Sequence, residues 1–88
     1  MDSRQNVHER VLDILSQVSA SEDVRTQPDL PLYASGLLDS LGTVTLMVEL
    51  GEALGMTISP AEFDVDAWAT PRKLLADVDR RLASQRAG

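Results

Sequence analysis

An aspartate and a serine, Asp39 and Ser40, stand side by side just before a long apolar segment near the middle of the 88-residue chain. Either side chain could cap a helix that begins here, by accepting a hydrogen bond from its free N–H groups. The serine hydroxyl could also carry a covalently attached group. A phosphoester there would be stabilised by the positive end of the helix dipole, and the carboxylate beside it could help to hold Mg²⁺ during phosphoryl transfer. The pair therefore predicts either a helix cap or an attachment site.

Catalysis by the chain itself is disfavoured by the residues available to help Ser40. A nucleophilic serine needs a base and a group that orients the base. The one histidine, His8, lies among charged residues, where we expect a solvated surface side chain. Gly36 and Gly42 do not flank Ser40 at the spacing of a nucleophile elbow. Cysteine is absent and the acidic residues lack calcium-loop spacing, so we predict no enzyme, no catalytic residue and no metal site.

Four helices are expected to position the pair. Apolar residues at steps of three and four predict a helix over residues 4–18 and a second over residues 40–54, which the following glycine stops. A capping box predicts a short helix from the SPAEF segment at residues 59–63. A threonine and a proline open the last helix, at about residues 71–84. Residues 19–39 form a long first loop, which Val24, Leu30, Leu32 and Tyr33 can pin to the core.

The predicted fold class is all-α: a bundle of three long helices and one short helix, with a long first loop. The length supports a single domain, residues 1–88, with one small core. Only three residues are aromatic, so this core must be aliphatic. We expect a monomer.

The helix predicted over residues 40–54 has more apolar residues than one buried face requires. One stripe is suited to the core and consists of Leu46, Met47, Leu50 and Leu54. A second stripe, also at steps of three and four, consists of Leu41, Val44 and Val48. Either the second stripe is a partly exposed docking surface, or the helix is central and buries both.

The charge is unevenly distributed along the chain. No basic residue occurs between Arg25 and Arg72, an interval that holds seven of the 14 acidic residues. Such a surface repels nucleic acid and anionic lipid and attracts basic protein patches, although it also serves solubility. The sequence has no apolar signal segment and no run long enough to span a membrane, which fits a cytoplasmic protein that is not membrane-embedded.

The motif G-x-L-D-S-L at residues 36–41, with a helix on each side, resembles the acyl and peptidyl carrier proteins. The resemblance covers roughly residues 4–82. It implies a small helical bundle that receives a covalent 4′-phosphopantetheine arm from coenzyme A through a phosphopantetheinyl transferase. Ser40 is then the attachment residue and Asp39 the acidic residue before it. The implied partner surface consists of Leu38, Leu41, Val44, Val48 and Glu49.

Within the family, the chain looks like the D-alanyl carrier proteins. Fatty-acid carriers usually have an acidic residue two positions after the modified serine, where this chain has Gly42. The runs DSLGTVTLMVEL and EFD…W…TP match the D-alanyl pattern, the second through Glu62, Phe63, Asp64, Trp68, Thr70 and Pro71. We expect Phe63 and Trp68 to fill the core beneath the loop.

This resemblance implies that an adenylating ligase loads an amino acid on the arm as a thioester, and that a membrane acyltransferase passes it towards teichoic acid. Free-standing carriers of antibiotic assembly lines share the same features, so that alternative stays open. A third hypothesis is a helical adaptor that binds a partner through the second stripe and uses Ser40 only as a cap.

Overall fold

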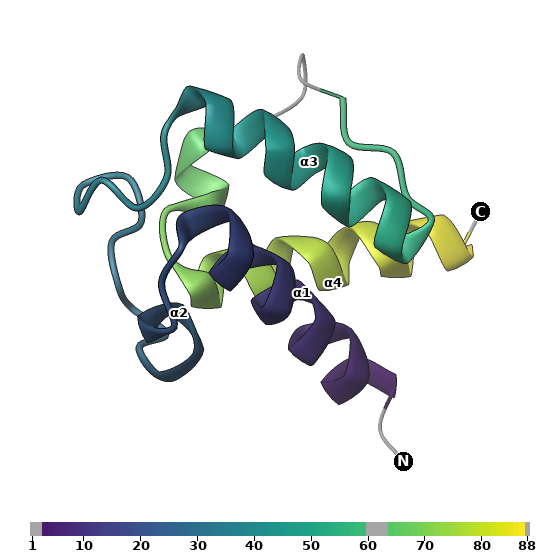
Figure 1. Ribbon diagram of the computed structural model, residues 1–88. Helices are drawn as coiled ribbons and strands as arrows, with labels where there is room; N and C mark the ends of the chain where they lie inside the picture. The colour runs from purple at the N-terminus through teal and green to yellow at the C-terminus, as the bar shows by residue number, and fades with distance from the viewer. Residues whose placement is uncertain (1–2, 60–63, 88) are drawn as a thin grey trace.

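The computed structural model describes residues 3–59 and 64–87. Three long helices form the body of the fold: α1 (Ser3–Ser19), α3 (Ser40–Leu54) and α4 (Pro71–Ala87). Two short helices, α2 (Asp23–Thr26) and η2 (Val65–Trp68), lie in the connections. All regular structure in the described ranges is helical, as predicted (Figure 1).

Among the described residues, the buried core is aliphatic apart from the side chain of Trp68. Each of the three long helices contributes fully buried side chains, and these surround Trp68, which is 0 % exposed; the fully buried aliphatic residues include Val11, Leu15, Leu46, Leu50, Leu74 and Val78. The prediction that Trp68 fills the core is confirmed. Phe63 lies outside the described residues, as does all of the capping box predicted over residues 59–63 except Ser59.

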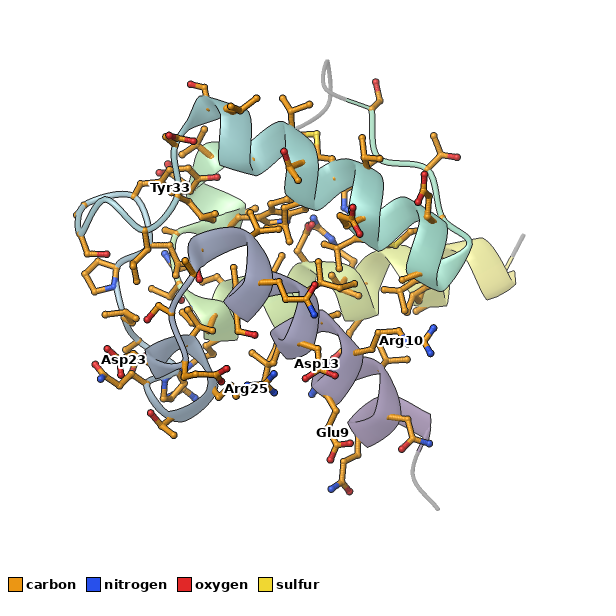
Figure 2. All side chains as sticks on the ribbon, viewed as in Figure 1. Glu9, Arg10, Asp13, Asp23, Arg25 and Tyr33 are labelled. Atoms are coloured by element: carbon orange, nitrogen blue, oxygen red, sulfur yellow. The ribbon has the colours of Figure 1, made fainter. Side chains whose placement is uncertain are left out.

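The first connection is more ordered than the predicted loop. It contains the single turn α2, and Val24 and Leu32 are buried in the core while Leu30 and Tyr33 pack against it. Arg25 of α2 forms an ion pair with Asp13 of α1 (Figure 2) and a second one with Glu22. These contacts tie the connection to the end of α1.

The same connection is hydrogen-bonded to the start of α4. Leu32 N–H donates to the carbonyl of Ala69 at 2.8 Å, and Arg72 N–H donates to the carbonyl of Pro28 at 2.9 Å. The side chain of Arg72 forms an ion pair with Asp29 that lowers the pKa of this carboxyl group. Although about twenty residues separate α1 from α3, the segment is therefore held at both ends and in the middle.

A buried carboxylate joins η2 to α4. Asp77 is 5 % exposed, and its side chain accepts hydrogen bonds from Trp68 Nε1 at 2.8 Å and from Arg81 Nε at 2.7 Å, and forms an ion pair with Arg80. Burial alone would raise the pKa of Asp77, but the bonds from Arg81 and Trp68, with the charges of Arg81 and Arg80, lower it below its ordinary value. Asp77 and Arg81 are four residues apart on α4, a spacing that favours such a pair, whereas the bond from Trp68 has no local signal in the sequence.

The prediction of a solvated His8 is wrong. Its Nε2 atom lies 2.8 Å from the Asp79 carboxylate, and both side chains are about one third exposed, at 29 % and 32 %. The contact connects α1 to α4. Residues 71 positions apart in the sequence form it, and local charge patterns carry no signal for such a pair.

Candidate functional site

Ser40 is the first residue of α3, and its side chain is exposed. Within residues 3–59 and 64–87, no group forms a hydrogen bond with its hydroxyl. An exposed hydroxyl at a helix N-terminus lies beside free N–H groups and the positive end of the helix dipole, which favour an attached phosphate. The geometry therefore fits a phosphoester on this oxygen.

The cap of α3 is Asp39, not Ser40. Asp39 has extended backbone angles, and its side chain accepts a hydrogen bond of 2.7 Å from Gly42 N–H. Capping of this kind satisfies one of the donors that a helix start leaves without an intrahelical partner. From the sequence alone, either of the two residues could be the cap. Because Asp39 takes that role, the serine hydroxyl is not needed for the helix.

A buried polar contact fixes the start of α3 to the first connection. Thr43 is 6 % exposed, and its Oγ1 donates to the Asp39 carbonyl and hydrogen-bonds the Tyr33 hydroxyl at 2.7 Å. Burial raises the pKa of Tyr33, while the bond to Thr43 lowers it less. Leu38 N–H also donates to the carbonyl of Leu32 at 3.0 Å. These bonds hold the chain on both sides of Ser40.

The second apolar stripe of α3 is exposed, which decides between the two possibilities left open by the sequence. Leu41 is 75 % exposed, and Val44 and Val48 are each 52 % exposed. Three apolar side chains on one exposed helix face form a surface suited to protein contact. Glu49 is also exposed and lies at the edge of this row.

Leu38 does not belong to this surface. It is 3 % exposed and forms part of the core, so its predicted contact with a partner is wrong. The residue immediately before the cap turns inward, whereas Leu41, just after the serine, points outward. Leu38 and Leu41 lie on opposite sides of the helix start, so the helical periodicity of the sequence does not indicate which of the two is buried.

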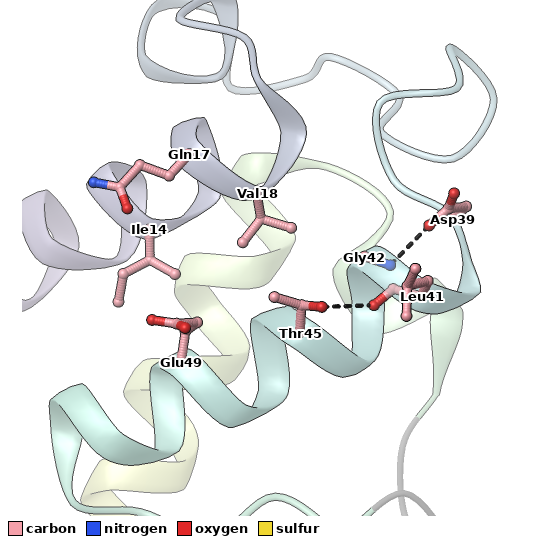
Figure 3. A pocket seen from close by; sticks show the side chains of 8 residues that line it. All are labelled: Ile14, Gln17, Val18, Asp39, Leu41, Gly42, Thr45 and Glu49. Atoms are coloured by element: carbon pink, nitrogen blue, oxygen red, sulfur yellow. Dashed lines mark hydrogen bonds between the residues drawn. The ribbon is translucent and has the colours of Figure 1, made fainter.

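An open groove lies between α1 and α3 and begins at Asp39 and Leu41, the residues on either side of Ser40 (Figure 3). Its lining residues come from both helices and are Ile14, Gln17, Val18, Asp39, Leu41, Gly42, Thr45 and Glu49. A Cβ atom added to Gly42 would lie only 3.2 Å from the Asp39 carboxylate, so the glycine leaves room for the cap, whereas its 3.7 Å distance to Val18 of α1 is an ordinary contact. The contribution of α1 was not predicted, since the helical pattern of Ile14 and Val18 indicates only burial.

The comparisons with known proteins agree with this site. The family model described as a phosphopantetheine attachment site matches residues 9–78. The chain belongs to this phosphopantetheine-binding carrier family. Its cofactor is therefore covalently attached 4′-phosphopantetheine, as predicted from the resemblance.

Several curated relatives of this carrier protein are D-alanyl carrier proteins. The one from Lacticaseibacillus casei (strain BL23) is 47 % identical over 70 residues, which cover 80 % of this chain and 86 % of the relative. The one from Enterococcus faecalis (strain ATCC 700802 / V583) is 38 % identical over 74 residues, or 84 % of this chain and 95 % of the relative. The one from Bacillus velezensis (strain DSM 23117 / BGSC 10A6 / LMG 26770 / FZB42) is 40 % identical over 67 residues, or 76 % and 86 %.

The carrier fold and its cofactor assign clear tasks to the chain. The arm supplies a thiol, which this cysteine-free chain lacks, and the thiol holds an acyl group as a thioester. The chain itself provides the attachment point and a surface that other enzymes recognise. Among the described residues, no helix is long and apolar enough to cross a membrane, and no three His, Cys, Asp or Glu side chains gather as metal ligands.

Proposed function

We propose that Ser40 carries the phosphopantetheine arm and that the carrier shuttles a D-alanyl thioester between an adenylating ligase and a downstream acyltransferase. The observation that supports the attachment residue is the exposed Ser40 hydroxyl at the first position of α3, left without a capping role because Asp39 performs it. The D-alanyl cargo is supported by relatives named for it that match most of the chain.

The partner surface of this proposal is the exposed row of α3. Leu41, Val44 and Val48 supply apolar contact close to the attachment point, and Glu49 at its edge adds negative charge. Basic residues are missing from the whole interval between Arg25 and Arg72. A partner with an apolar groove rimmed by basic side chains fits this surface, and electrostatic attraction would speed its encounter with the carrier.

Asp39 contributes to attachment in two ways in this proposal. Its side chain fixes the helix start through Gly42 N–H, and its other carboxylate oxygen, which accepts no hydrogen bond from the described residues, can face the donor. The modification transfers the phosphopantetheinyl group from coenzyme A to the Ser40 oxygen, which loses its proton, while adenosine 3′,5′-bisphosphate leaves. We place this reaction in the cytoplasm, where coenzyme A is made.

The experiment that tests the proposal follows the intact mass of the purified protein. Incubation with coenzyme A, Mg²⁺ and a promiscuous phosphopantetheinyl transferase is expected to add one phosphopantetheinyl group to the wild type and none to Ser40→Ala. A wild type that stays unmodified, or an adduct on Ser40→Ala, rejects the attachment residue. Under the adaptor hypothesis, the wild type would stay unmodified.

The cargo is tested on the modified protein with a panel of adenylating ligases and amino acids. Loading by a D-alanine-activating ligase, with poor loading by ligases for other amino acids, is the expected result. Preferential loading by a ligase of an antibiotic assembly line would instead support the alternative pathway and leave the attachment site intact.

A further inference from the structure

The groove between α1 and α3 runs from the residues on either side of the attachment point to a carboxylate further along the helix. Asp39, Leu41 and Gly42 line its start, and Thr45 and Glu49 continue it along α3 (Figure 3). Glu49 is nine positions after Ser40, which places it about 14 Å further along the helix axis and about half a turn around it. An extended phosphopantetheine arm, which contains two amide units and their linkers, would enter the groove by passing around the start of α3, beside Asp39 and Gly42.

The lining of the groove fits a cation with a small apolar side. Ile14 and Val18 form an apolar wall on α1, while Gln17 and Thr45 offer polar groups. The lining includes two carboxylates and no basic residue. Asp39 is engaged by Gly42 N–H, whereas Glu49 forms no ion pair or side-chain hydrogen bond with any residue in 3–59 or 64–87.

The end of the groove beyond Glu49 has a basic residue that is already engaged. Arg10 of α1 donates a hydrogen bond of 3.1 Å to the carbonyl of Ala53, one helical turn after Glu49. It lies outside the lining residues and is not within ion-pair distance of Glu49. The hydrogen bond to a carbonyl leaves the charge of Arg10 in place, but Arg10 forms no ion pair with Glu49, so the Glu49 carboxylate is available to a positively charged ligand.

An aminoacyl thioester ends in such a ligand, because its α-amino group is protonated at neutral pH. We propose that the groove holds the aminoacyl end of the loaded arm, with the ammonium group beside the Glu49 carboxylate and the small side chain against Ile14 and Val18. The inference rests on the proposed function, since it needs an arm on Ser40. It assigns Glu49 to the cargo as well as to the rim of the partner surface.

This placement distinguishes aminoacyl from plain acyl cargo. An acyl group of the same size without an amine gains no ion pair in the groove. A partly exposed ion pair shifts the ratio of docked to free arm by about 1.5- to 5-fold. The docked state is therefore in exchange with a free arm that partner enzymes can take up, and its population falls with rising salt.

The test compares two arms that differ by one ammonium group. Stable amide analogues of coenzyme A, one D-alanyl and one propionyl, are attached to isotope-labelled protein with the phosphopantetheinyl transferase. Amide and methyl chemical shifts are then recorded at low and high salt. We expect the D-alanyl arm to perturb the Ile14 and Val18 methyl groups and the Thr45 and Glu49 amides, and the propionyl arm to perturb them less, with the difference decreasing at high salt.

A matched pair of variants assigns the effect to one carboxylate. Glu49→Gln removes the charge in the groove, and Glu52→Gln removes an exposed charge from the same helix that lines a different depression. The difference between the two arms is expected to disappear in Glu49→Gln and to persist in Glu52→Gln. Equal perturbation by both arms, or a difference that survives Glu49→Gln, overturns the inference.

The outcome for the groove is separable from the outcome for the carrier function. Intact mass reports first whether each arm has been attached to the protein. Absence of the adduct rejects the proposed function itself. A complete adduct without any difference between the D-alanyl and propionyl arms leaves the carrier function in place and rejects only the role of Glu49.

Discussion

Substitutions at Asp39 and Ser40 are expected to separate the stability of α3 from the attachment of the arm. Asp39 receives the capping hydrogen bond from Gly42 N–H at 2.7 Å, whereas the Ser40 hydroxyl is exposed and has no described partner. Three variants remove different parts of this arrangement. Asp39→Ala removes the cap and the charge, Asp39→Asn keeps a good cap and removes the charge, and Ser40→Ala removes only the hydroxyl.

The expected losses of stability follow that order. Replacing a capping aspartate with alanine costs about 1 to 2 kcal/mol. Asn caps about as well as Asp, so Asp39→Asn costs only the favourable interaction of a charge with the helix dipole, about 0.3 to 1 kcal/mol. An exposed helix position tolerates Ser40→Ala within about 0.5 kcal/mol. For a domain of this size, 1 kcal/mol corresponds to a change of about 4 to 8 °C in melting temperature.

Two measurements on the same samples check the prediction. Urea unfolding can be followed by the fluorescence of Trp68, which is the only tryptophan and is fully buried. Intact mass gives the rate at which the phosphopantetheinyl transferase modifies each variant. We expect Ser40→Ala to be stable and unmodified, Asp39→Ala to be the least stable, and Asp39→Asn to be stable but slowly modified because its carboxylate is lost.

Particular results would refute each part of this reasoning. If Ser40→Ala lost as much stability as Asp39→Ala, the serine would be part of the cap after all. If Asp39→Asn were modified at the wild-type rate, the carboxylate would have no role beyond capping. Higher salt should reduce the stability difference between wild type and Asp39→Asn, since it screens the charge at the helix end.

Two further predictions use other parts of the fold. Leu41→Asp and Val48→Asp should slow loading by the partner ligase while changing the free energy of unfolding by about 0.5 kcal/mol or less. Leu38→Asp, by contrast, should unfold the protein because it buries a charge. An equal loss of stability in all three variants would contradict the exposure of Leu41 and Val48. Asp77→Asn should cost about 2 kcal/mol at neutral pH. Because the folded-state pKa of Asp77 is lowered, the wild type should lose this advantage as pH falls through that pKa, and a pH-independent difference in urea midpoint would contradict the ion-pair account.

The helix that bears the site could be predicted from the sequence because its signals are local. Gly55 has a left-handed backbone at φ 66° and ends α3, as expected from a glycine after the last apolar residue. The start of α3 was also predicted, but the cap was not, since Asp39 and Ser40 have the same capping chemistry. Only the backbone geometry, with Asp39 extended and Ser40 helical, distinguishes them.

Contacts between distant segments could not be predicted in this way. Trp68 was expected to fill the core beneath the loop, yet nothing local indicated that its N–H would need the Asp77 carboxylate. His8 was assigned to solvent because its sequence neighbours are charged, and its actual partner Asp79 is on the last helix. Periodicity specifies which face of a helix is buried, but it does not specify which polar residues of other helices meet it.

The structure divides α3 into three faces where the sequence indicated two. Thr43, Leu46 and Leu50 face the core, and Leu41, Val44 and Val48 form the exposed row. Between them lies a narrow third face, made of Gly42, Thr45 and Glu49, that borders α1 and forms one side of the groove.

Small or polar residues on this third face gave no hydrophobic signal, so the two-stripe interpretation passed over them. A carrier has to present one face to its partners and still control its own arm. Because these tasks are separated on α3, a charge change at Glu49 is expected to alter how the aminoacyl end of the arm docks without altering the core. A change at Val48 is expected to alter partner contact without altering the groove.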